Sequence, residues 1–297
     1  SLDAVLPGKD EVLFNINVGT FNIDSLSTEL NVVGDEISNR KNTLSNDYIC
    51  LTDTNTYGLT GELDGIFSAD EKHQNLGKLV FHIMKPQENK NAGGSWGIGK
   101  TVYYRLGIGL VLYYSRIQLD SGEYQERLAG ALVEDESKCD NLLKSDKDNV
   151  GVAFFGKFKS GTNNEIMAIT DTNIIHRVLS IFKINPLENS STGTKIIIPF
   201  INKEKLLNNT STSDINCQND PWWQEKIEDY LYVAILRWYF PRLNKSYTYK
   251  PILKAYIGLN PVLPKKETVL FEKFSELYSS ISSNNNSSWI KKVEIKR

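Results

Sequence analysis

The sequence has few cysteines, and none is arranged to bind zinc or to form a disulfide framework. There are three, Cys50, Cys139 and Cys217, with no C-x-x-C spacing among them. A small, odd and scattered set is typical of a reducing compartment, so we expect a cytoplasmic protein without a structural zinc site.

Long apolar runs and a charge excess of one sign are also missing. No segment approaches the run of about 18 apolar residues that a membrane span needs, and no signal peptide is visible. The sequence therefore predicts no membrane association. The formal net charge of −2 supplies no overall basic field of the kind that dedicated nucleic-acid-binding proteins carry. The composition, 40% hydrophobic and 24% charged, is typical of a soluble globular protein.

Hydrophobic periodicity predicts a protein with both helices and strands. Residues 54–66 form a predicted loop rich in Thr, Asn and Gly, and residues 78–84 fit a strand or a helix. Strands are predicted at 11–18, 48–52, 129–134, 150–158, 195–200 and near 249–257. Helices are predicted at about 98–117, 172–182, 221–243 and near 266–282.

A polar stretch rich in Asn, Ser and Thr divides the chain. We expect residues 206–219 to be a linker between a domain at 1–205 and a small α/β segment at 220–297. The helix of 221–243 is predicted to be amphipathic, which favours core packing, with a partner-binding groove or a transducer role as the functional alternative. The residues near its apolar face are Trp223, Ile227, Tyr230, Leu231, Ala234 and Trp238.

One short motif raises the question of function. Residues 93–101, GGSWGIGKT, satisfy G-x-x-x-x-G-K-[ST], the written form of a phosphate-binding P-loop. A P-loop lies tightly between a strand and a helix, but the nearest upstream strand candidate ends at Met84, about nine residues earlier. The segment 166–171, IMAITD, is the only candidate for the partner strand that ends in a magnesium-binding Asp. A P-loop NTPase and a glycine-rich surface loop without a ligand therefore remain alternatives.

Four short segments in a fixed order favour another family. They are SLDA at 1–4, DTNTYGLTG at 53–61, GGSWGIGK at 93–100 and GTKIIIP at 193–199. Together they resemble the four motifs of the GHKL ATPases, the Bergerat-fold superfamily of DNA gyrase B, the ninety-kilodalton heat-shock chaperone, sensor histidine kinases and MutL. The resemblance covers roughly residues 1–200. It implies an α+β two-layer sandwich, in which helices cover a mixed sheet, followed by a helix-rich C-terminal segment.

The second and fourth motifs would hold the adenine of ATP. In the family, an Asp at the place of Asp53 accepts a hydrogen bond from the exocyclic amine, and a Thr at the place of Thr194 holds the same edge, often through water. Gly58 and Gly61 would let the backbone pass close to the nucleotide. The match departs from D-x-G-x-G, because Asn55 and Thr56 stand where the first glycine is expected. Taken alone, Asp53 could equally cap a turn.

The third motif would be a lid that wraps the phosphates. Its G-G-x-x-G-x-G pattern is matched by the glycines of 93–99, and amides at the start of the next helix would face the phosphates. Lys100 would add a cation near the terminal phosphates unless it is only a solvated lysine, and we expect Trp96 to anchor the loop. The implied ATP-binding residues are Gly93, Gly94, Ser95, Trp96, Gly97, Ile98, Gly99, Lys100 and Thr101.

The first motif matches only at its end. In the family it reads E-x-x-x-N-x-x-D-A, where the Glu activates the attacking water and the Asn binds magnesium. Asp3 and Ala4 match the last two letters, so the Asn and the Glu would precede Ser1. We therefore expect this chain to be part of a longer ATPase, with ATP and Mg²⁺ as cofactors, Asp3 near the adenine, and neither catalytic nor metal-binding residues of its own.

These motifs predict a nucleotide-gated conformational switch. ATP would close the lid, the closed form would form a homodimer or grip a protein or DNA partner, and slow hydrolysis would reset it. The C-terminal part is loosely similar to the region after the ATPase domain in bacterial proteins encoded beside restriction or phage-defence genes, which suggests DNA transactions or phage defence. The alternative is a non-catalytic partner-binding module on a degenerate ATPase fold. A sensor kinase would need a phosphoacceptor His beside an acidic residue on a helix, which His73, His82 and His176 do not provide.

Overall fold

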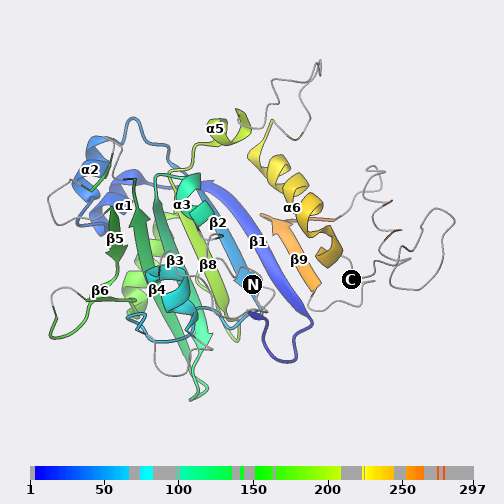
Figure 1. Ribbon diagram of the computed structural model, residues 1–297, viewed down its shortest axis with the longest axis horizontal. Helices are drawn as coiled ribbons and strands as arrows, with labels where there is room; N and C mark the ends of the chain where they lie inside the picture. Colours follow the sequence, from blue (N-terminus) through cyan, green and yellow to red (C-terminus); the bar gives the residue numbers. More distant parts are fainter. Residues whose placement is uncertain are drawn as a thin grey trace, which may run out of the picture.

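The fold was obtained as a computed structural model, which is drawn in Figure 1. Its description is confined to these parts of the chain: 4–66, 74–82, 99, 101–135, 141–143, 151–162, 165–208, 223, 225–243, 252–263, 273 and 277. These residues form a mixed α/β protein around one large sheet.

The sheet has eight strands in the order β10-β9-β1-β2-β8-β3-β4-β5. All neighbouring strands are antiparallel except β1 and β9, which are parallel. The strands are β1 (Glu11–Thr20), β2 (Asp47–Thr54), β3 (Leu110–Gln118), β4 (Tyr124–Val133), β5 (Val152–Phe155), β8 (Gly193–Pro199), β9 (Ile252–Ile257) and β10 (Asn260–Pro261). A separate two-stranded sheet pairs β6 (Lys157–Phe158) with β7 (Ile166–Met167).

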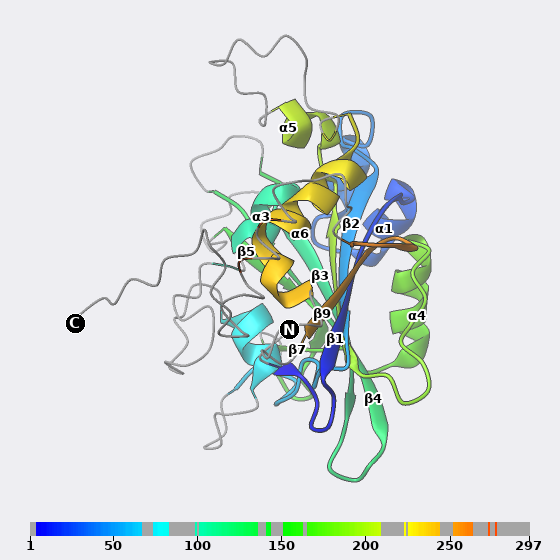
Figure 2. The same ribbon diagram turned by 90° about the vertical axis from the view of Figure 1, so that its right-hand side faces the viewer.

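One face of the large sheet is covered by α1 (Ile23–Glu29), α2 (Gly34–Asn39) and α4 (Thr172–Ile181), as Figure 2 shows for α1 and α4. The side chains of these helices pack on the faces of β3, β4 and β8 that point toward them. The sequence explains α4 well, because Asp171 caps its first turn and Ile175, Val178 and Leu179 form one buried stripe.

The opposite face is covered by the π-helix η3 (Gly77–Phe81), α3 (Thr101–Leu106) and α6 (Ile227–Leu243). Ile235 and Leu236 of α6 pack in a core with Val12 of β1 and Leu253 of β9. The described helices therefore form layers on both sides of the sheet, rather than the single helical layer of a two-layer sandwich. The physical reason is that both faces of the central strands are apolar.

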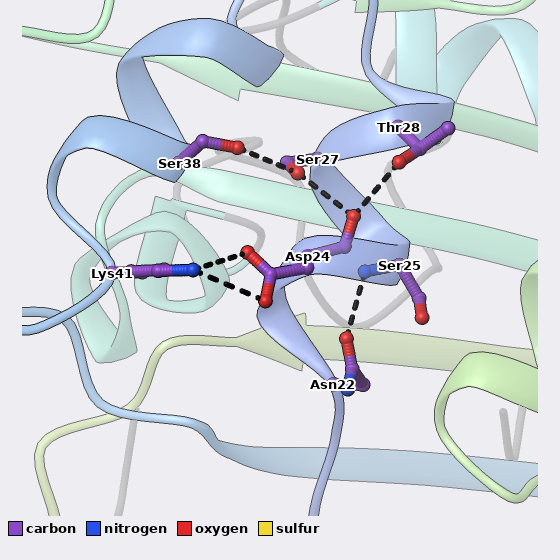
Figure 3. Close-up of polar contacts among 7 residues, drawn as sticks. All are labelled: Asn22, Asp24, Ser25, Ser27, Thr28, Ser38 and Lys41. Carbon is purple, nitrogen blue, oxygen red and sulfur yellow. Dashed lines mark hydrogen bonds and ion pairs between the residues drawn. The ribbon is translucent and has the colours of Figure 1, made fainter.

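The corner between α1 and α2 is fastened by polar contacts (Figure 3). Asn22 caps α1 by accepting a hydrogen bond from the Ser25 amide at 2.8 Å. The Ser38 hydroxyl of α2 donates to the Ser27 hydroxyl of α1 at 2.9 Å, and Lys41 forms an ion pair with Asp24 at 3.1 Å. Along the chain, this corner lies between the first motif at 1–4 and the second at 53–61.

Most predicted strands are confirmed, but the predicted helix at 98–117 is wrong. The segment forms the short helix α3 and then β3, with Gly107 and Gly109 between them. A side chain on Gly109 would lie 2.2 Å from the Val133 carbonyl oxygen, and one on Gly107 would lie 2.4 Å from that of Pro199. The two glycines thus permit the close approach at which the chain turns from helix to strand.

The C-terminal segment contributes to the same sheet. β9 pairs with β1, and α6 packs beside β9 on the same core, as Figure 1 shows. α6 begins at Ile227, six residues after the predicted start at residue 221. α5 (Lys203–Asn208) occupies the start of the predicted linker. The remainder of that linker, 209–219, lies outside the described residues, as does nearly all of the helix predicted near 266–282.

Candidate functional site

Four polar side chains lie in one row across the face of the sheet that carries α3 and α6. Asp53 of β2 pairs with Thr194 of β8, Thr194 pairs with Ser115 of β3, and Ser115 pairs with Arg127 of β4. Because residues paired across strands point to the same face, these four residues form a continuous polar row. The next row along the same strands is mainly apolar and consists of Leu51, Ile196, Tyr113 and Ala129.

Asp53 is held by neutral donors on one side only. Its Oδ1 accepts hydrogen bonds from the Thr56 hydroxyl at 2.7 Å and from the Thr194 amide at 3.1 Å. Its Oδ2 accepts none from the part of the chain that the structure describes, and the same is true of the Thr194 hydroxyl. The carboxylate is thus fixed in orientation, with one oxygen available to a ligand that donates a hydrogen bond.

The surroundings of Asp53 disfavour its charge. The residue is partly buried, and loss of water raises the pKa of its carboxyl, although the hydrogen bond from Thr56 acts in the opposite direction. Tyr103 of α3 lies close enough for the charge of Asp53 to contribute to its raised pKa, after the larger effect of burial. Asp53 has no cationic side-chain partner among the described residues, and an ionisable group with a perturbed pKa is a typical feature of functional sites.

The loop after Asp53 takes a conformation that few residue types adopt. Asn55, Gly58 and Gly61 have positive φ angles of 65°, 70° and 100°. Asn tolerates this left-handed region better than other residues with a side chain, so Asn55 does at its position what a glycine would do. The departure from D-x-G-x-G therefore changes the letters but retains a left-handed backbone position.

Thr192 and Gly193 bring β8 against this loop. The Thr192 hydroxyl donates to the Thr56 carbonyl at 2.6 Å. A side chain on Gly193 would lie 2.0 Å from the Asp53 carbonyl oxygen, a distance that no Cβ can adopt. The glycine of the Gly193-Thr194 pair is thus required by the close approach of the two strands beside Asp53.

Ser115 and Arg127 hold the loop of 55–61 through hydrogen bonds to its backbone. Ser115 is fully buried; its hydroxyl donates to the Gly193 carbonyl at 2.7 Å and accepts from the Leu59 amide at 2.8 Å. Arg127 is 6% exposed and donates to the carbonyls of Leu59 and Gly61 at 3.0 and 2.6 Å. Burial lowers the pKa of Arg127 to about 10, and the charge of Glu62 opposes that shift.

Only part of the predicted site falls on described residues. The structure brings together Asp53, Thr194 and the loop of 55–61, and Thr101 begins α3 on the same face of the sheet. Gly99 is exposed, with open space around it. Outside the described residues lie Asp3, Gly93, Gly94, Ser95, Trp96, Gly97, Ile98 and Lys100.

Sequence reasoning missed Ser115, Arg127 and Thr192. Ser115 lies among the buried apolar residues Val111, Tyr113 and Ile117 on one face of β3, and a lone polar residue on such a face is a signal that could have found it. Arg127 follows the polar start of β4, YQER, so its signal is weaker. Thr192 carries no comparable signal, because Thr is common in turns.

Comparisons with known proteins give this chain no relative: no family model, curated protein or solved structure matches it. Among the described residues, no group of three or more His, Cys, Asp or Glu side chains could hold a metal ion. Of the helices in that same part of the chain, none has both the length and the apolarity to cross a bilayer.

Proposed function

We propose that this chain binds ATP, with the adenine seated on the polar row against Asp53. The observation that carries the proposal is the state of the Asp53 carboxylate. One oxygen is fixed by Thr56 and Thr194, and the other is left without a donor from the described residues. The second oxygen is open to a donor from a ligand, and an exocyclic amine would supply that hydrogen bond.

The adenine edge also fits the neighbour of Asp53. Beside its exocyclic amine, adenine has a ring nitrogen that only accepts hydrogen bonds. The Thr194 hydroxyl lies in the same row and can donate, directly or through water. Guanine has a carbonyl at the place of the adenine amine, so the same pose would direct an acceptor at a carboxylate. ATP should therefore bind better than GTP.

The strand order supports a GHKL-type base site as part of this proposal, although the helices on the second face of the sheet depart from that family's two-layer sandwich. β8, which carries the Gly193-Thr194 pair, lies between β2, which ends near Asp53, and β3, which follows α3. Asp53 and the Gly193-Thr194 pair, which are far apart in the sequence, thus lie side by side in the sheet. The P-loop alternative is less compatible, because every strand neighbouring β3 or β8 is antiparallel to it, whereas a P-loop belongs to a parallel strand–loop–helix unit.

The proposal also includes ATP hydrolysis and a conformational switch, and both would depend on residues outside the described part of the chain. The phosphates would be held by the glycine-rich motif at 93–101. Mg²⁺, when bound, would neutralise phosphate charge. The contribution of the polar row is to bind and orient the base. A non-catalytic module would keep this same base site, so the competing hypotheses differ only in the events that ATP binding triggers.

The test is a thermal-shift titration of the 297-residue chain with ATP and with GTP. A ligand at 100 times its Kd stabilises the folded state by about 2.7 kcal/mol, so ATP should raise the Tm measurably. Asp53→Asn should abolish the shift. Because Oδ1 is held by two donors, the amide nitrogen of Asn would occupy the Oδ2 position and present N–H groups to the adenine amine.

Two further variants complete the test. Asp47→Asn is the matched control, since Asp47 begins the same strand but forms an ion pair with Lys203 at 2.7 Å; it should keep the ATP shift. Lys100→Ala separates the proposal from the P-loop alternative. A shift that survives Asp53→Asn and disappears in Lys100→Ala would replace adenine recognition by a P-loop, and no shift with ATP in the unmodified chain would contradict nucleotide binding.

A further inference from the structure

Arg127 is a buried cation without a carboxylate directly bonded to it. Its side chain is 6% exposed, and it donates to three neutral oxygens: the carbonyls of Leu59 and Gly61 and the side-chain oxygen of Gln125. Buried charges are normally paired with opposite charges, because neutral partners recover less of the lost hydration. Such an arrangement is retained where the geometry that it enforces has a use.

That geometry is the backbone of the loop at 58–61. Arg127 binds the carbonyl on either side of Thr60, while Ser115 binds the amide of Leu59 and the carbonyl of Gly193. Two adjacent side chains on β3 and β4 thus hold two segments at once, the glycine loop and the start of β8. A Cβ on Gly58 would lie 2.6 Å from the Ser115 hydroxyl, so the loop rests directly on this pair.

We propose that Ser115 and Arg127 are positioning residues, which fix the 58–61 loop and Gly193 in the arrangement that the adenine pocket requires. The inference rests on the proposed function and names the residues that set its affinity without contacting the nucleotide. A preformed loop binds more tightly because no ordering entropy is lost on binding. Arginine suits the task because its planar group reaches several oxygens in fixed directions, which lysine cannot do.

The test measures binding of a fluorescent ATP analogue, with adenosine and inorganic triphosphate as competitors, at a temperature where every variant is fully folded by circular dichroism. Arg127→Met and Ser115→Ala should weaken the analogue and adenosine by the same factor, about tenfold or more, and leave competition by triphosphate unchanged. Arg127→Lys should lower the affinity for the analogue and adenosine less, by about threefold, because it retains a charged donor. Arg40→Met, which removes an arginine that holds the Asn141 carbonyl at 2.9 Å near α2, is the control and should lower the Tm alone.

Each other outcome has a definite meaning. Affinities within about twofold of the unmodified chain, with only the Tm lowered, would reduce Ser115 and Arg127 to structural residues and overturn the proposal. A loss for the ATP analogue but not for adenosine would show that the Arg127 charge acts on phosphates, which also overturns it. Asp53→Asn is measured in parallel: if it alone abolishes binding, the proposed function stands while positioning fails, and if the unmodified chain binds nothing, both fail.

Discussion

Strand β2 has an aspartate at each end, and the two are held in opposite ways. Asp47, at the start, forms an ion pair with Lys203 at 2.7 Å and accepts from the Ser45 hydroxyl at 3.2 Å. Asp53, near the other end, has only neutral donors, all on one oxygen, and burial raises its pKa. Asp47 is satisfied within the protein, whereas Asp53 has an oxygen that no described residue satisfies.

The difference separates a carboxylate that the fold satisfies from one that, under the proposed function, is kept for a ligand. A carboxylate that only stabilises a strand end would gain a cation, as Asp47 does, because pairing offsets lost hydration. The chain instead surrounds Asp53 with Thr side chains, a left-handed loop and the close approach of Gly193. Natural proteins depart from local stability in this manner mainly at functional sites.

The largest expected effect comes from Gly193→Ala, which would displace β8 from β2 at Asp53 but leave the surroundings of Asp47 unchanged. The new Cβ would lie 2.0 Å from the Asp53 carbonyl oxygen, so one strand must move. We expect a loss of about 3 kcal/mol or more in the free energy of unfolding, measured by urea denaturation. Gly122→Ala is the control. Gly122 also has a positive φ, 87° against 157° for Gly193, but it has open space around it.

Gly122→Ala should cost only about 1 kcal/mol, the strain of a left-handed alanine. Equal losses in the two variants would mean that backbone conformation, not the contact with Asp53, explains the glycine at position 193.

A smaller effect, of opposite sign at the two ends of β2, is expected from replacing each aspartate by asparagine. Without ligand, Asp53→Asn should raise the free energy of unfolding, since it removes a charge that burial disfavours and keeps an oxygen for Thr56 and Thr194. Asp47→Asn should lower it by about 0.5 kcal/mol, the typical contribution of a partly exposed ion pair. Urea denaturation of both variants tests this, and a destabilised Asp53→Asn would make Asp53 an ordinary structural residue.

Local periodicity in the sequence was enough to predict much of the sheet. The strands at 11–18, 48–52 and 195–200 and the helix at 172–182 are confirmed. Residues 11–18 alternate, residues 172–182 repeat with the helical period, and the other two segments are short apolar runs of strand length. The segment 98–117 misled because its tyrosines and apolar residues fit a helix as well as a strand. The turn that divides it is imposed by contacts with distant carbonyls at Pro199 and Val133, which leave no local signal.

The site shows the same limit. Asp53 and Thr194 could be named from short motifs, although 141 residues separate them, because the resemblance supplied the pairing that local patterns lack. Arg127 lies 66 residues from Gly61, and no sequence pattern in either segment predicts the hydrogen bond between them. The parallel pairing of β1 with β9, which joins Glu11 to Ile252, could not be predicted either, since sheet order depends on global packing.

The smallest expected effect is the pH dependence of the Asp53→Asn difference. The native pKa of Asp53 lies above 3.8, so between 3.8 and that value the native state binds more protons than the unfolded state. The unmodified chain therefore gains stability relative to Asp53→Asn as pH falls through the native pKa, and the gap between them closes and stays constant below about pH 3.8.

ATP binding should change in the opposite direction over the same pH window. The protonated Asp53 would present an O–H donor to the adenine amine, so affinity falls as pH falls while stability rises. Urea denaturation and ATP titration of the unmodified chain and Asp53→Asn, from pH 7 down to about pH 4, measure both quantities. A carboxylate that served only the fold would lose stability on protonation, so a gap that widens toward acid would make Asp53 an ordinary structural residue. Opposite slopes for stability and affinity would mean that the charge of Asp53 is retained for the ligand at the expense of the fold.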